Sequence, residues 1–214
     1  AYRWAREIGA DYLECDMQVS KDGVVLALHD DNLKRTTNIE TVFGETLPRE
    51  IRKNYYMKIG YSETEAEEKV KADEANFVPN LPAYYTYEEL LMLDAGSWFN
   101  NENLEEALPG LAKEKQYIST LEDLIMYSKG YRLIRDRNQP GMPRQYSIVG
   151  KTGETITSLS GTADIVKYDF GYEIDPVWEA GNKNIPGIYI EFKEPWLNPK
   201  GFEQIVYDVL ANTQ

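Results

Sequence analysis

Two carboxylates lie two positions apart in a strand-like segment near the start of the chain, residues 12–19. In a β-strand, Glu14 and Asp16 point to one face, whereas Leu13 and Cys15 point to the other. A hard cation binds such a pair when a further carboxylate converges on it. The other interpretation is an edge strand with one solvent-exposed face, and the spacing of the two carboxylates alone favours this simpler interpretation.

Two other apolar runs end in polar groups that could take part in the same chemistry. Residues 24–29 end in His29, which is the only histidine of the chain, and residues 188–193 place Glu191 and Lys193 on one strand face. Three converging carboxylates repel one another unless a cation lies between them. Without a thiolate partner or a second histidine, the set favours Mg²⁺ or Ca²⁺ over zinc. The alternatives are a structural histidine and an exposed Glu191–Lys193 pair.

These residues require a scaffold of strands with helices between them. The alternation predicts an α/β fold with a parallel sheet, in which functional groups gather at the carboxyl ends of strands. In a closed barrel, the apolar strand faces would pack on the helices, and Cys15 would be a core residue. Helical patterns cover residues 1–8, 85–96, 119–130 and 201–214, and Ser119 with Glu122 predicts a capping box at the third of these.

Two segments are predicted to be insertions. Residues 39–84 contain the charged run SETEAEEKVKADEA, which indicates a helix with a solvated face. Residues 131–185 are rich in Gly, Thr and Asn, and three weak strand signals there predict a hairpin-like excursion.

The composition limits the classes of partner. Among 214 residues, 36 acidic against 23 basic side chains give a net charge of −13, which argues against nucleic acid or an anionic membrane surface as a partner. No run of 18 apolar residues predicts a membrane span. A single cysteine excludes an internal disulfide.

Four motif blocks, in order, carry a family resemblance. AREIGADYLECDMQVSKDGVVLALHDDNLKRTTN is followed by LDAGSWFN, ISTLEDLI and YIEFKEP. This set resembles the glycerophosphodiester phosphodiesterase family, with Ser119 standing where proline is usual. The E-x-K-x-P segment is similar to the bacterial periplasmic or secreted branch.

The resemblance implies a TIM-barrel scaffold, hydrolysis of a small glycerophosphodiester to glycerol 3-phosphate and an alcohol, and a Ca²⁺ or Mg²⁺ cofactor. His29 matches one of two histidines that act as general acid and base. Lys193 matches the basic group near the phosphate, and Arg35 matches a position on the substrate side whose role is structural or loop-positioning. The implied metal ligands are Glu14, Asp16 and Glu191.

The sequence departs from the family pattern in lacking a second histidine and the later barrel strands. We therefore expect residues 1–214 to be an internal piece of the barrel domain, with little turnover alone, and expect a periplasmic or secreted location. Two rival functions are a non-catalytic metal- or glycan-binding domain and a phospholipase D-like barrel acting on intact lipids. The second would need an exposed apolar loop near the site, for which residues 54–61 are the candidate.

Overall fold

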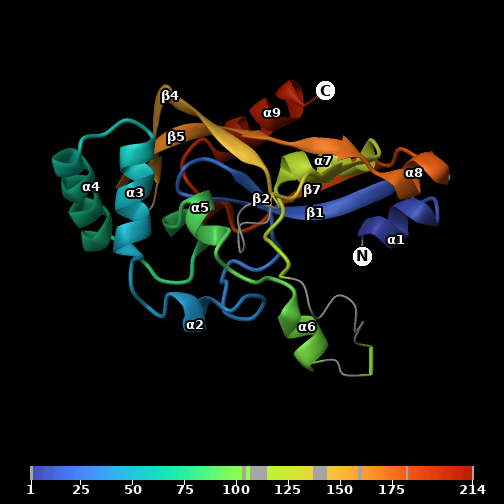
Figure 1. Cartoon of the computed structure of the whole chain (residues 1–214), viewed down its shortest axis with the longest axis horizontal. Coiled ribbons are helices and arrows are strands. Elements are labelled where there is room, and N and C mark those ends of the chain that lie inside the picture. The colour runs from blue at the N-terminus through green and yellow to red at the C-terminus, as the bar shows by residue number, and fades with distance from the viewer. Residues whose placement is uncertain are drawn as a thin grey trace.

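A computed structural model describes residues 2–102, 105–106, 115–136, 144–158, 161–181 and 183–213. The central element is strand β1 (Tyr12–Val19), which lies between β2 (Val25–Ala27) and β7 (Gly187–Phe192) in an open sheet of order β2-β1-β7 (Figure 1). Strand β7 runs parallel to β1, as predicted, although about 170 residues separate them.

The prediction of a parallel β2 is wrong. Strand β2 is antiparallel to β1, with Met17 opposite Ala27 and Val19 opposite Val25. Only a tight turn joins the two strands, and a parallel connection needs a dozen or more residues. The strand also ends at Ala27, so that His29 lies in the loop that follows it.

The apolar face of β1 packs against two helices, as expected for a barrel strand. These helices are α7 (Leu121–Ser128) and α9 (Phe202–Asn212), and α1 (Tyr2–Glu7) leads into the strand. Burying this face supplies the hydrophobic stabilisation that orients the polar face. The shared core consists of Leu13, Cys15, Met17, Val19, Val25, Leu121, Leu124, Ile125, Phe202 and Val206.

The cap of α7 differs from the prediction by one residue. Thr120 is the N-cap, its hydroxyl accepts from the Asp123 N–H, and the Asp123 carboxylate accepts from the Thr120 N–H. The reciprocal pattern is the expected capping box, but it uses Thr120 and Asp123 rather than Ser119 and Glu122.

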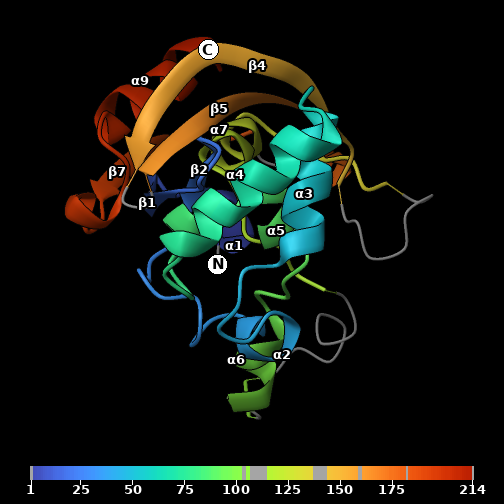
Figure 2. The ribbon, with the colours of Figure 1, turned by 90° about the vertical axis from the view of Figure 1, so that its left-hand side faces the viewer.

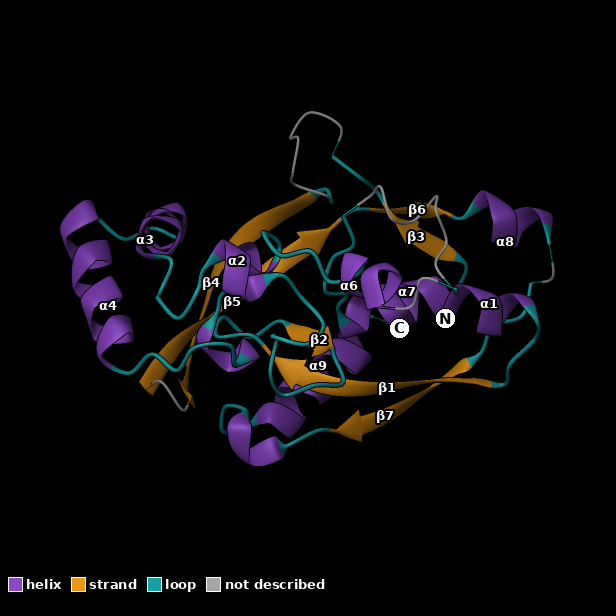
Figure 3. Ribbon diagram, turned by 90° about the horizontal axis from the view of Figure 1, so that it is seen from below, coloured by secondary structure: helices purple, strands orange, loops and turns teal. Residues whose placement is uncertain are grey.

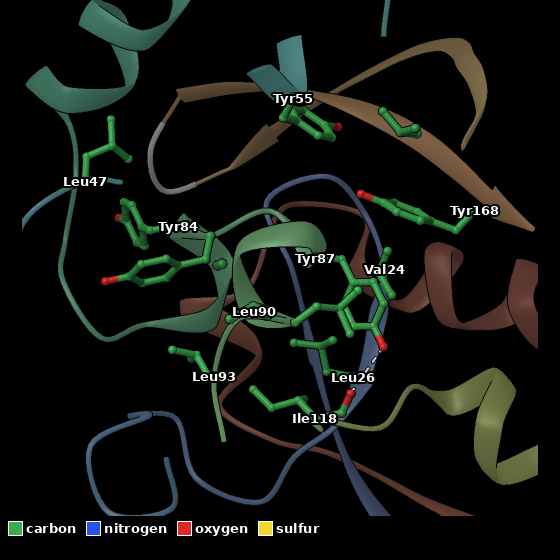
Figure 4. Close-up of a cluster of buried hydrophobic side chains, with 14 of the residues drawn as sticks. Val24, Leu26, Leu47, Tyr55, Tyr84, Tyr87, Leu90, Leu93, Ile118 and Tyr168 are labelled. Atoms are coloured by element: carbon green, nitrogen blue, oxygen red, sulfur yellow. Dashed lines mark hydrogen bonds between the residues drawn. The ribbon is translucent and has the colours of Figure 1, made fainter. Parts of the chain in front are cut away.

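A second core is rich in tyrosine and joins the sheet to both segments predicted as insertions. Figure 4 shows Tyr87 beside Leu26 and Ile118, and its hydroxyl donates to the Ile118 carbonyl at 3.2 Å. Tyr55, Tyr84 and Tyr168 belong to the same core. Its elements are α3 (Arg49–Lys58), α4 (Glu63–Ala75), the 3₁₀ turn η1 (Pro82–Tyr84), α5 (Tyr87–Leu90), β4 (Tyr146–Ser158) and β5 (Gly161–Phe170).

The predicted characters of both segments are confirmed. Helix α4 carries the charged run and buries only Ala66, Val70 and Asp73. Strands β4 and β5 form the predicted antiparallel hairpin, which arches over the molecule in Figure 2. The helix predicted over residues 85–96 is shorter, because α5 ends at Leu90.

The remaining elements are short, and Figure 3 shows most of them from below. They are α2 (Ile39–Val42), α6 (Ser97–Glu102), β3 (Tyr131–Leu133), β6 (Tyr172–Ile174), α8 (Pro176–Ala180) and η2 (Pro195–Leu197). Among the described residues, no helix combines the length and apolar character needed to cross a bilayer.

Candidate active site

Three carboxylates converge on the polar face of the β1–β7 ladder. Asp16 lies directly opposite Glu191 in the parallel register, and Glu14 precedes Asp16 by one pleat repeat. One carboxylate oxygen from each residue lies within 4.8 Å of the others. Adjacent parallel strands hold their backbones in fixed register, so this convergence is set by the sheet.

The cluster suits a hard divalent cation. Its donors are all carboxylate oxygens, which Ca²⁺ and Mg²⁺ prefer. Asp16 is nearly buried, whereas Glu14 and Glu191 are exposed, so a cation would be reached from the solvent side. Within the described residues, the donor set therefore fits the group that the sequence predicted.

Lys193 supplies the positive charge beside this cluster. Its Nζ lies 3.3 Å from a Glu191 oxygen and 3.6 Å from Asp16 Oδ1. The hydrogen bond to Glu191, with the nearby carboxylate charges, raises the pKa of Lys193, so it is an ammonium at neutral pH. It can contact an anionic oxygen without leaving the cluster.

Asn198 fixes the loop that carries Lys193. Its side-chain oxygen accepts from the Val19 N–H at 2.9 Å, and its amide nitrogen donates to the carbonyl oxygens of Lys193 and Glu194. Glu194 adopts a left-handed conformation with φ of 42°. The chain therefore turns sharply after Lys193 and is tied back to β1.

The Lys-Asp-Gly turn fixes the β1–β2 hairpin from its closed end. The Asp22 carboxylate accepts from the Ser20 hydroxyl, the Tyr87 N–H and the Tyr168 hydroxyl at 2.6 to 2.9 Å. Burial raises the pKa of Asp22, against the lowering effect of these donors. Gly23 has φ of 89°, a value that disfavours any residue with a Cβ. The turn therefore fixes where β2 begins. The register of β2 against β1 follows from it, with Val19 opposite Val25 and Met17 opposite Ala27.

His29 reaches the level of the acidic cluster because the hairpin folds back. The Leu28 N–H donates to the Asp16 carbonyl at 2.9 Å, which extends the hairpin by one residue beyond β2. His29 follows directly, and its side chain is 66% exposed. Its Nδ1 lies 2.8 Å from Asp30 Oδ1. The imidazole is thus accessible to solvent, and among the described residues its ring is hydrogen-bonded through Nδ1 only.

Asp30 is in turn held by Arg35. The Arg35 Nε lies 2.6 Å from Asp30 Oδ2 and its Nη2 lies 2.7 Å from Oδ1, which is a two-point contact. The Arg35 hydrogen bonds are the main reason that the pKa of Asp30 falls to about 2. The guanidinium also lies over the Trp98 ring, 5.3 Å from its centre.

The sequence analysis selected the three carboxylates, His29, Lys193 and Arg35, but not the residues that position them, which are Asp22, Asp30, Trp98 and Asn198. Asp30 and Trp98 were present only as letters of the motif blocks. The signal for both was the order of the HDD, RTT and SWF motifs. Arg35 faces Asp30, in keeping with a loop-positioning role.

Two candidate features lie elsewhere. Cys15 is 1% exposed on the helix side of β1, and burial, then Glu14 and Asp16, raise the pKa of its thiol to about 12. Residues 54–61 do not form an exposed apolar loop. Residues 54–58 belong to α3, in which Tyr55 and Tyr56 are buried, and Ile59 just after the helix is buried as well. The feature needed by the intact-lipid alternative is therefore missing from that segment.

The comparisons with known proteins assign a family. The chain matches the sequence model of the glycerophosphoryl diester phosphodiesterase family over residues 1–136. It belongs to this family, whose fold is a TIM barrel. The open α/β sheet described above is consistent with part of such a barrel.

Individual relatives agree with this assignment. The chain is 27% identical to a glycerophosphodiester phosphodiesterase of Bacillus subtilis over 58% of this chain and 29% of that protein. It is 28% identical to the glycerophosphoinositol inositolphosphodiesterase GDPD2 of Mus musculus, in a match that covers 74% of this chain and 25% of that protein. It is also 25% identical to the putative glycerophosphodiester phosphodiesterase YhdW of Bacillus subtilis, in a match that covers 80% of this chain and 50% of that protein. The chain therefore spans between a quarter and a half of the length of these relatives.

Proposed function

We propose that this chain supplies the cation site and one proton-transfer histidine of an enzyme that hydrolyses glycerophosphodiesters to glycerol 3-phosphate and an alcohol. The observation that carries the proposal is the convergence of Glu14, Asp16 and Glu191 beside Lys193. Family membership supplies the substrate class. The names of the bacterial relatives agree with it.

The cation is Ca²⁺ or Mg²⁺ in this proposal, and Glu14, Asp16 and Glu191 hold it. When bound, it supplies positive charge that neutralises the phosphate and the charge developing during P–O cleavage. Lys193 donates a hydrogen bond to a non-bridging phosphate oxygen. Lys193 thereby holds the diester beside the carboxylates that would bind the cation.

His29 carries a proton to or from the reacting oxygens. In the overall reaction, water or a glycerol hydroxyl forms a new P–O bond, the bond to the departing alcohol breaks, and that oxygen takes a proton. One group removes the proton from the nucleophile and another protonates the leaving oxygen. His29 performs one of these transfers, and the 214 residues contain no second histidine for the other. We therefore propose that a second proton-transfer group performs the other transfer.

Cation binding by the chain itself is the first test. Titration calorimetry with Ca²⁺ and with Mg²⁺ should detect binding, and the double variant Glu14→Gln/Asp16→Asn should abolish it. Glu203→Gln removes an exposed carboxylate on α9, away from the site, and should bind as the unchanged chain does.

Turnover is the second test. Release of glycerol 3-phosphate from glycerophosphocholine should require the cation and stop in excess chelator. The assay uses protein that also contains the second proton-transfer group. Activity that survives chelation, or survives the double variant, contradicts the cation mechanism. Cation binding without turnover in that protein supports the non-catalytic binding domain instead.

The E-x-K-x-P segment from Glu191 to Pro195 further supports a periplasmic or secreted location for the enzyme. Cell fractionation with an antibody to the chain tests this, and recovery in the cytoplasmic fraction alone would contradict it.

A further inference from the structure

The side chains behind His29 form a connected series that the cation site does not use. His29 contacts Asp30, Asp30 contacts Arg35, and Arg35 lies over Trp98. We propose that Asp30, held by Arg35, is a positioning residue that keeps the His29 proton on Nδ1 and leaves Nε2 free for proton transfer. This inference rests on the proposed function for its catalytic meaning, although the tautomer itself can be measured without any activity.

The first step of the argument concerns the state of Asp30. Its two oxygens accept three donors: Oδ2 accepts from Arg35 Nε, and Oδ1 accepts from Arg35 Nη2 and faces His29 Nδ1 at 2.8 Å. A guanidinium always donates, and an ionised carboxylate only accepts. The proton between Asp30 and His29 therefore belongs to the imidazole.

The second step concerns the other ring nitrogen. A neutral imidazole carries one proton, so a proton on Nδ1 makes Nε2 an acceptor. Nε2 is then the atom that can remove a proton from a nucleophile or, once protonated, return it.

The third step concerns what holds Arg35. Its loop is tied to the segment before α6: the Asn38 N–H donates to the Asp94 carbonyl at 3.2 Å, and the Asp94 N–H donates to Asn38 Oδ1 at 2.8 Å. This pair brings the Trp98 helix against the Arg35 loop. The packing matters because His29 is largely exposed, so water competes for Nδ1 unless Asp30 is kept in place.

The experiment uses the fact that the chain has one histidine. Nitrogen-15 NMR correlations of the ring need no assignment, and they distinguish a protonated Nδ1 from a protonated Nε2. At a pH where the ring is neutral, we expect the Nδ1–H tautomer in the unchanged chain. In Asp30→Asn, an amide oxygen in the place of Oδ2 keeps the hydrogen bond from Arg35 Nε, whereas the amide nitrogen in the place of Oδ1 cannot accept from Nδ1 or from Arg35 Nη2. We therefore expect the Nε2–H tautomer to predominate.

Two further variants separate positioning from general effects. Asp31→Asn makes the same change of charge one residue along and should leave the tautomer unchanged. Arg35→Lys keeps the charge but loses the two-point contact. We expect a mixture of both tautomers there, with backbone amide spectra showing that the fold is retained.

The kinetic readout is loss of kcat without a matching change of KM. In the turnover assay, we expect Asp30→Asn to lower kcat by roughly 10²- to 10⁴-fold, the range of a lost general acid–base step. Cation affinity should stay within about twofold, which is a matched readout of the intact acidic cluster.

The outcomes distinguish this inference from the proposed function. A predominant Nε2–H tautomer in the unchanged chain, or no change of tautomer in Asp30→Asn, overturns the positioning role even if hydrolysis is found. The expected tautomers together with no hydrolysis support the arrangement of Asp30 and His29 and reject the proposed reaction instead.

Discussion

Replacing Arg52 with methionine should destabilise the protein strongly, because Arg52 neutralises two buried acids. Its guanidinium lies between α3, α4 and α5 and is almost completely buried. Nε and Nη2 contact Glu89 at 2.8 and 2.7 Å, Nη2 also donates to the Tyr84 carbonyl, and Nη1 contacts Asp73. Removing the guanidinium leaves both carboxylates without their main partner.

The magnitude follows from this burial. Removing one partner of a buried ion pair costs about 3–5 kcal/mol, chiefly because the remaining charge is desolvated and unpaired. Asp73 retains Lys21, whose Nζ lies 2.8 Å away, whereas Glu89 loses its only cationic contact among the described residues. For a chain of this length, roughly 2–4 °C of melting temperature accompany each kcal/mol, so we expect a fall of about 6–20 °C.

Arg49 is a matched control on the same helix. It also contacts two carboxylates, Glu67 and Glu74, but these pairs lie at the surface. Surface pairs contribute about 0–1 kcal/mol. Arg49→Met should therefore change the free energy of unfolding by no more than this, although it removes the same number of ion pairs.

Equilibrium unfolding in urea measures both variants. The double variant Arg52→Met/Glu89→Gln should recover part of the loss, because glutamine removes the buried charge and can still accept from the Thr86 N–H as Glu89 does. If Arg52→Met costs no more than Arg49→Met, or if Glu89→Gln deepens the loss, the desolvation argument is wrong.

Three more predictions concern the site. The Arg35 hydrogen bonds depress the pKa of Asp30 to about 2, so their stabilisation is complete above the ordinary Asp value of about 3.9 and is lost as pH falls through about 2. The difference in unfolding free energy between the unchanged chain and Asp30→Asn should therefore shrink as pH falls from about 4 to about 2. Buried Cys15 should resist iodoacetamide in the native state and react readily in urea, as mass spectrometry would show; rapid native labelling would contradict its placement. Lys193→Met removes the positive ammonium group beside Glu191, so calorimetry should find tighter Ca²⁺ binding while the rate of hydrolysis falls. An unchanged Ca²⁺ affinity would mean that Lys193 has no electrostatic effect on the three carboxylates.

The sequence predicted the residues of the acidic cluster because β-strand alternation is a local property. Parity within β1 and within β7 places Glu14, Asp16 and Glu191 on polar faces whatever the rest of the chain does. That β7 is the strand beside β1, with Asp16 opposite Glu191, depends on long-range pairing. Periodicity carries no information on such pairing, and only the resemblance between motif sets suggested it.

The direction of β2 was mispredicted because apolar character was weighed before turn length. Lys21, Asp22 and Gly23 lie in the short turn between the two strands, and a turn so short permits only an antiparallel return. The position of His29 depends on that return, since antiparallel pairing brings the end of β2 beside Asp16. The contacts of Arg35 with Asp30 and with Trp98 join side chains that share no strand or helix, so hydrophobic periodicity could not place them and only the order of the motifs pointed to them.

The two halves of the site are consequently held by different forces, and this separates their responses to mutation. The carboxylates are positioned by backbone hydrogen bonds of the β1–β7 ladder, whereas His29 is positioned by side-chain contacts in a loop. Loss of Arg35 should therefore impair proton transfer while cation affinity is retained. A change that weakens the ladder, such as Ile190→Asn on the partly buried face of β7, should lower cation affinity and activity together. If Arg35 variants lose cation binding to the same extent as activity, the loop and the ladder form one cooperative unit, and the division drawn from their contacts is wrong.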